Sequence, residues 1–282
     1  MVYLSLISAL MCNVSLSLLD KKTSGQLTGD SQVLRFSLFK TAACAAFAIL
    51  ILPFSPLTID LPGILIGLMA GIFCALSVVL IMRALKKTLA VYVNLFMSAG
   101  IIMPTIFGAA FLSQPLTILK LACLVLLIIS LALTLGVKKG GHFSLGSLLP
   151  MFICYGGLMI AQGIFPKFSP ESSKAMFSLV MYGSATVLLF FAQGKRKTEE
   201  KRPLTKPLIL IGLVTAAVNL SVNLLLTSLS AKLDAAIVFP TVHGMKLVAV
   251  TILSGILWKE RLKPLQILGT LLSILFVCGL NM

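Results

Sequence analysis

The chain has 282 residues, 59% of them hydrophobic and only 11% charged, and its formal net charge is +15. Soluble domains carry about 25% charged residues, so this composition excludes a soluble globular protein and predicts an integral membrane protein. The basic residues fall in short gaps between apolar runs. We therefore attribute the net charge to membrane topology and lipid contact, and expect no nucleic-acid partner.

Ten apolar runs are long enough to cross a hydrocarbon core of about 30 Å as helices. They are continuous rather than alternating, which excludes the strands of a barrel and predicts an all-α protein. The first run, at the N-terminus, has no basic segment before it and is interpreted as a span rather than a cleaved signal. The predicted spans are 2–19, 32–52, 62–82, 89–111, 117–137, 145–165, 174–193, 207–227, 234–257 and 264–281.

The order of elements in the first half recurs in the second half. Cys12 and Leu16 align with Cys154 and Leu158 at a separation of 142 residues. We therefore predict two five-helix repeats, 1–139 and 140–282, within one transmembrane domain. Five helices carry the chain across the membrane, so the second repeat is expected to be inverted relative to the first.

Each half is predicted to end with a helix, a polar turn and a very apolar helix. The first half has Gln114 at this turn and the second half has Glu260. The residues that carry this pattern are Ala90–Gln114 followed by Leu116–Gly136, and Ala235–Glu260 followed by Leu262–Gly279.

With ten spans and a five-plus-five repeat, this arrangement resembles the drug/metabolite transporter (DMT) superfamily, in its EamA-like branch. Glu260 matches the turn glutamate of that family, and Gln114 departs from it. The resemblance implies secondary transport of small metabolites or drugs, with no catalytic residues. It also implies a central cavity lined by the first, third, fourth, sixth, eighth and ninth spans, with the fifth and tenth at the periphery.

The distribution of Lys and Arg predicts the orientation. The odd-numbered loops, with Arg35 and Lys40 counted among their residues, hold 18 of the 23 basic residues, and the even-numbered loops hold 4. The positive-inside rule then places both termini outside the cell, against the habit of the family. The short loops and the lysine bias favour a multi-pass protein of the cell membrane, in particular a bacterial inner membrane.

Lys246 lies near the middle of the ninth predicted span. A central lysine costs about 2.5–3.5 kcal/mol on insertion scales, so it should face protein or a water-filled cavity. No acid is expected in the middle of any span, because Asp20, Asp60, Asp234 and Glu260 are all assigned to span ends. Three interpretations stay open: binding of an anionic substrate group, a deprotonated lysine that takes part in proton coupling, and a structural role.

His243 lies three residues before Lys246, on the same helical face, and the two are predicted to form a basic patch. Other polar side chains fall on the first, fourth, sixth, eighth and ninth spans, and they either join helices or line a wet cavity. The second, fifth, seventh and tenth spans are expected to contribute no central charge. The predicted substrate-binding residues are Lys246, His243, Asn94, Ser98, Asn13, Asn219, Asn223, Tyr155 and Gln162.

Gly63, Gly67 and Gly71 are spaced by four residues on the third span, which indicates close helix packing within the protein or in a homodimer. Pro240 permits a bend in the ninth span. The six cysteines include no C-x-x-C pair and are interpreted as small buried hydrophobic residues, so we expect no metal and no cofactor.

The sequence contains no HExxH, GxSxG or GxxxxGK[ST] segment, which argues against an enzyme and against ATP-driven transport. We therefore expect a secondary active transporter that moves a small anionic or zwitterionic metabolite, such as an amino acid or organic acid, by alternating access. A proton or sodium ion is the expected coupling partner. The alternatives are a cationic drug exporter of the same superfamily and a non-transporting membrane subunit or receptor.

Overall fold

The computed structural model describes residues 2–111, 145–194, 203–233 and 235–259, with isolated helical positions between 122 and 129 and between 264 and 272. Within these ranges the regular structure is helical and no strand occurs. The elements are α1 (Val2–Ser24), α2 (Asp30–Ile51), the 3₁₀ turn η1 (Leu52–Phe54), α3 (Leu61–Lys87), α4 (Ala90–Ala99), α5 (Ile102–Phe111), α7 (Leu145–Phe168), α8 (Lys174–Gly194), α9 (Lys206–Ser230) and α10 (Ala235–Trp258).

Eight helical segments of the described chain are long and apolar enough to cross a membrane, with α4 and α5 together forming one of them. They coincide with eight of the ten predicted spans. The chain therefore has the all-helical pattern of a multi-pass membrane protein. The predicted fifth and tenth spans, 117–137 and 264–281, lie outside the described residues apart from the isolated positions, as do Gln114 and Glu260.

The fourth span is broken, although the sequence predicts one helix over 89–111. α4 ends at Ala99 and α5 begins at Ile102, with a tight turn at Gly100 whose amide bonds to the Met97 carbonyl at 3.1 Å. A Cβ at Gly100 would lie 3.3 Å from the Gly156 amide of α7, so the backbones approach closely here. α10, in contrast, is one helix that continues through Pro240.

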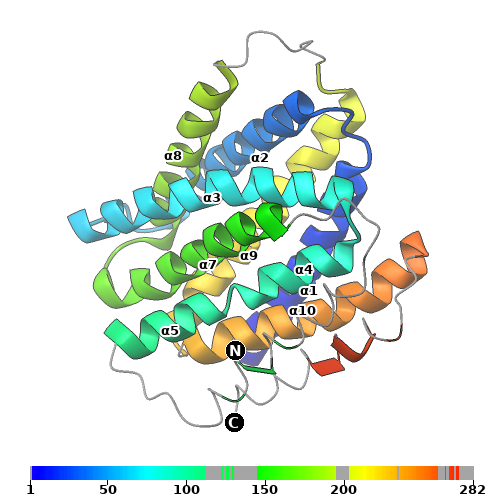
Figure 1. Cartoon of the computed structure of the whole chain (residues 1–282). Coiled ribbons are helices and arrows are strands. Elements are labelled where there is room, and N and C mark those ends of the chain that lie inside the picture. Colours follow the sequence, from blue (N-terminus) through cyan, green and yellow to red (C-terminus); the bar gives the residue numbers. More distant parts are fainter. Residues whose placement is uncertain are drawn as a thin grey trace.

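Helices from the two halves of the chain pack against each other rather than forming separate units. α3 packs on α7 and α8, α2 on α8 and α9, α1 on α9 and α10, and α4 on α7 and α10. Figure 1 shows α4 and α5 as consecutive segments that run along α10. The inverted relation between the halves remains a prediction.

The glycine stripe of α3 packs inside the protein. A Cβ at Gly67 would lie 2.8 Å from Val180 Cγ1, and a Cβ at Gly71 would lie 2.7 Å from the Met181 carbonyl oxygen, both on α8. These glycines let the two helices approach more closely than larger side chains would allow. The predicted alternative of internal packing is therefore the one found in this monomer.

Replacing Gly71 with alanine is expected to destabilise the protein by about 1–3 kcal/mol, because α8 must shift to relieve the contact with the Met181 carbonyl. Gly183→Ala is the matched control, since nothing lies within 4 Å of its Cβ position. Thermal unfolding in detergent compares the two variants. Equal midpoints would show that the α3–α8 contact is not tight.

One end of the bundle is joined by a contact between the α2–α3 and α7–α8 loops. The Ser173 amide donates to the Thr58 carbonyl at 2.7 Å, and the Ser172 hydroxyl donates to Asp60 Oδ1 at 2.8 Å. Asp60 also caps α3 by accepting from the Gly63 amide at 2.9 Å. A single exposed carboxylate thus links the start of α3 to the opposite loop.

The hydroxyls of Ser169 and Ser172, together with the Gly63 amide, hold the pKa of the Asp60 carboxyl below its usual value. A depressed folded-state pKa stabilises the protein above the unfolded-state pKa, and that stabilisation is lost as the pH falls through the folded-state pKa. We therefore expect the unfolding midpoint of the wild type to fall more between about pH 5 and pH 3 than that of Asp60→Asn. Parallel pH profiles would contradict this.

Candidate functional site

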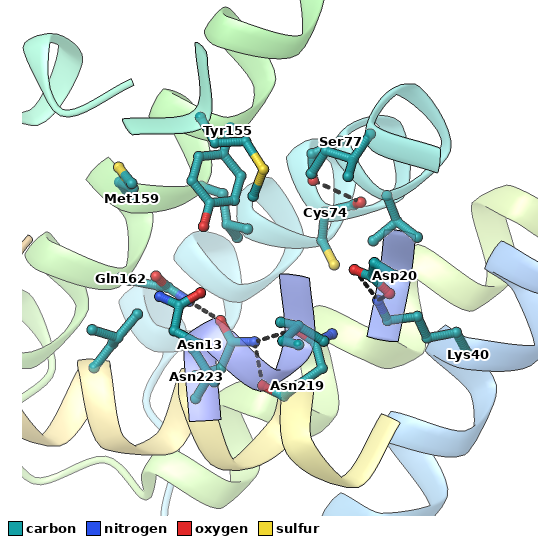
Figure 2. A pocket seen from close by; sticks show the side chains of 17 residues that line it. Asn13, Asp20, Lys40, Cys74, Ser77, Tyr155, Met159, Gln162, Asn219 and Asn223 are labelled. Carbon is teal, nitrogen blue, oxygen red and sulfur yellow. Dashed lines mark hydrogen bonds and ion pairs between the residues drawn. The ribbon is translucent and has the colours of Figure 1, made fainter. Parts of the chain in front are cut away.

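Two adjoining cavities lie between the helices at the centre of the bundle, and Figure 2 shows the larger of them. The larger one is lined from α1, α2, α3, α4, α7 and α9, and the smaller one from α1, α3, α4 and α10. They share four lining residues: Leu16, Asp20, Ile81 and Met97. The larger cavity leaves about 50 Å³ for the centres of water molecules. One water needs at least about 10–15 Å³, so this conformation has room for a few waters but not for a metabolite.

An ion pair between Asp20 and Lys40 forms one wall of the larger cavity. Lys40 Nζ lies 2.7 Å from Asp20 Oδ1 and 2.9 Å from Oδ2. Both residues are nearly sealed from solvent, at 7% and 2% exposure. In a low-dielectric environment such a pair persists only when each charge has its partner in place.

This ion pair corrects two expectations. Asp20 was expected at the end of the first span, but α1 continues to Ser24 and Asp20 lies inside it. Lys40 was counted as a loop residue, and the second span was expected to carry no central charge. Lys40 instead lies in the middle of α2, since the carboxylate of Asp20 compensates its charge.

Lys21, the residue after Asp20, also lies within α1. Its ammonium group donates to the carbonyls of Leu85 and Thr88 at the end of α3. These tertiary partners explain why α1 runs through a charged segment that resembles a loop in sequence.

Lys246 lies near the middle of α10 and is only 1% exposed, as its central position predicts. Its side chain lines the smaller cavity together with Asp20 and Asn94. Within the described part of the chain, no hydrogen bond or ion pair is found for its ammonium group. The carboxylate of Asp20 already binds Lys40. The described residues that line the two cavities together, called the joint site below, thus include two lysines and one acid.

Three of the predicted amides form a network that joins α7, α8 and α9. The Gln162 amide donates to Asn223 Oδ1, and the Asn223 amide donates to the Tyr182 hydroxyl and to the Asn219 carbonyl. Gln162, Asn219 and Asn223 also line the larger cavity, so they both join helices and face the site. In Figure 2, Gln162 lies on the opposite side of the cavity from the ion pair, and Asn219 lies between the two.

Three more of the predicted residues, Asn13, Tyr155 and Asn94, line one of the two cavities. Asn13 and Tyr155 line the larger cavity, and the Asn13 side-chain nitrogen is buried with no hydrogen-bond partner among the described residues. Asn94 lines the smaller cavity and accepts from the Ser17 hydroxyl at 2.9 Å.

Ser98 and His243 line neither cavity. The Ser98 hydroxyl donates to the His243 carbonyl at 3.1 Å, which joins α4 to α10. The His243 ring is fully buried, 5.7 Å from the Tyr155 ring and 6.3 Å from the Phe239 ring, centre to centre. The structure therefore does not bring His243 and Lys246 together in one cavity.

The candidate site residues that sequence reasoning missed are Asp20 and Lys40. A signal for them existed, because Lys40 falls within the predicted span 32–52 and a lysine there requires a partner. Among the described residues, no group of three or more His, Cys, Asp or Glu side chains is placed to hold a metal ion. Cys74 lines the larger cavity as a free thiol and offers a chemical probe of access to it.

Comparison with known proteins gives a match of fold alone. The chain matches no protein-family model and no curated protein. A crystal structure described only as that of a "protein" is similar, with a TM-score of 0.68 over 99% of this chain and 95% of that chain. The two sequences are 12% identical, so the likeness extends to the fold and carries no activity with it.

Proposed function

We propose that the protein is a secondary active transporter that moves a small anionic or zwitterionic metabolite across a cell membrane by alternating access. The observation that carries this proposal is the buried site between helices of both halves, where Lys246 and Lys40 face a single acid, Asp20. Buried charges of this kind mark substrate or ion pathways in membrane proteins. The small size of the cavity requires helices to move before a metabolite enters.

The packing of the helices supports the repeat on which alternating access depends. In the predicted repeat, α1, α2, α3 and α4 correspond in that order to α7, α8, α9 and α10. The contact between α1 and α9 then corresponds to the contact between α7 and α3, and the contact between α2 and α9 corresponds to that between α8 and α3. The contact between α1 and α10 likewise corresponds to that between α7 and α4, and every one of these contacts occurs. A pseudo-two-fold relation of two inverted repeats accounts for this pattern, with the substrate site between them.

Membership of the DMT superfamily is part of the same proposal. The cavity is lined by the helices that the resemblance implies, with α2 in addition through Lys40. A gradient of protons or sodium ions, or exchange, supplies the energy. Both termini lie outside the cell in this proposal. Removing Lys40 from the basic residues assigned to loops leaves the bias of the odd-numbered loops intact.

The test is substrate-dependent flux into proteoliposomes that contain the purified protein, with protein-free liposomes as the control. The panel contains organic acids, amino acids, sugar phosphates, nucleosides and cationic drugs, first screened by thermal shift. A ligand at 100 times its dissociation constant stabilises a protein by about 2.7 kcal/mol. Flux of an anion or zwitterion is expected. Flux of cations alone would favour drug export, and the absence of any flux would favour a subunit or receptor.

A further inference from the structure

We propose that the ligand of this site is a small organic monoanion, whose carboxylate lies between Lys40 and Lys246 and whose remainder is neutral and polar. This inference rests on the proposed transport function and names its substrate class. It is carried by the number of charged residues that line the two cavities and by the position of Asp20, which lines both.

The charged residues that line the joint site do not balance. Asp20 lines both cavities, Lys40 lines only the larger and Lys246 only the smaller. Among the described lining residues, the one carboxylate binds Lys40, so no second carboxylate is left for the ammonium group of Lys246 in a region sealed from solvent. Burying an uncompensated charge is costly, so the occupied site is most stable when the ligand adds one negative charge.

Neighbouring charges do not change this count. Lys21 binds carbonyls at the end of α3, and Arg83 lies 3.5 Å from Asp30, and none of these residues lines either cavity. An amino acid would add an ammonium group as well as a carboxylate and leave the surplus positive charge in place. The site therefore matches a carboxylate without an amine better than it matches a zwitterion.

The opposite wall of the larger cavity is polar but uncharged. The separation of 142 residues that aligns Cys12 with Cys154 also aligns Asp20 with Gln162 and Lys40 with Tyr182. Gln162 and Tyr182 both bond to Asn223, so a neutral network occupies the place of the ion pair in the second half.

The Asn13 side-chain nitrogen, which has no hydrogen-bond partner among the described residues, belongs to a residue that lines the same cavity, and it requires an acceptor. One end of the ligand is therefore expected to be charged, while the other end donates and accepts hydrogen bonds without charge.

This inference is tested with ligands that share one carbon skeleton and differ from each other in net charge. Succinate, succinamate and succinamide carry about −2, −1 and 0, and glutarate, glutaramate and glutaramide repeat the series with one more methylene. Asparagine and glutamine add an ammonium group to the monoanions. Uptake of each compound into proteoliposomes and its thermal shift are measured on the wild type, on Lys246→Gln and on Asp20→Asn.

The wild type is expected to prefer a monoanion over the dianion, the diamide and the amino derivative by about tenfold or more, since truncating one partner of a buried charge pair costs at least that factor. Lys246→Gln leaves the site neutral, and its preference is expected to move to the diamide or the zwitterion. Asp20→Asn leaves two unmatched lysines, and its preference is expected to move to the dianion. Lys246→Gln breaks no ion pair of the described residues, so it tests the inference even if Asp20→Asn does not fold.

A wild type that prefers a zwitterion, a dianion or a diamide overturns the inference, as does a Lys246→Gln variant with unchanged selectivity. If none of these compounds binds while another organic anion or zwitterion is transported, the substrate class is wrong and the transport function stands. If nothing in the wider panel is transported, the proposed function itself fails.

Discussion

Replacing Lys40 with methionine is expected to lower the free energy of unfolding by about 3–5 kcal/mol, because it leaves the buried carboxylate of Asp20 without its partner. The double variant Asp20→Asn/Lys40→Met is expected to recover most of that loss. Replacing a whole buried ion pair by uncharged residues of similar volume is often neutral or stabilising. Unfolding in mixed detergent micelles, followed by circular dichroism, compares both variants with the wild type.

Lys232→Met is the matched control, since Lys232 is exposed in the turn after α9 and its replacement removes the same charge from a solvated position. A loss for Lys40→Met no greater than that of the control would contradict the role assigned to the ion pair. Repeating the measurement in a Lys246→Met background asks whether Lys246 shares the carboxylate. If it does, removal of Lys40 costs more in that background, because no second lysine is left beside Asp20.

Replacing Lys246 with methionine is expected to have the opposite effect on stability. Lys246 is buried, and no hydrogen bond or ion pair is found for it within the described chain. A central lysine costs about 2.5–3.5 kcal/mol on insertion scales, so its removal is expected to stabilise the protein by about 1–3 kcal/mol. The same change is expected to lower uptake of the anionic substrate at least about tenfold, because the ligand loses a buried counter-charge.

Lys40→Met and Lys246→Met each replace a buried lysine by methionine. The difference between the two variants therefore reports the difference in the surroundings of the two lysines. The expectation is a loss of stability at Lys40 and a gain at Lys246, with transport reduced at Lys246 despite the gain. Stability given up for function is common at binding sites. Destabilisation by Lys246→Met, with transport unchanged, would make Lys246 a structural residue and remove the basis for an anionic substrate.

Much of the helical arrangement follows from the sequence because hydropathy acts locally. A run of about 20 apolar residues is a span wherever it lies, and the eight described spans fall where the hydropathy places them. The burial of Lys246 also follows, since a lysine that far from both helix ends cannot reach the membrane surface. The break at Gly100 does not follow, because it depends on the close approach of Gly156 from α7.

In the candidate site too, some features follow from the sequence and others depend on the tertiary structure. The sequence by itself determines the class of protein, the places of the spans and the isolated lysine of α10, all of which depend on one stretch of chain at a time. Only the tertiary structure decides that Asp20 and Lys40 form a buried pair beside it, that Gln162 and Asn223 bond to each other, and that His243 packs among aromatic rings. These outcomes depend on which helices meet. In a low-dielectric interior the partner across the interface determines whether a charge is tolerated, and local hydropathy does not contain that information.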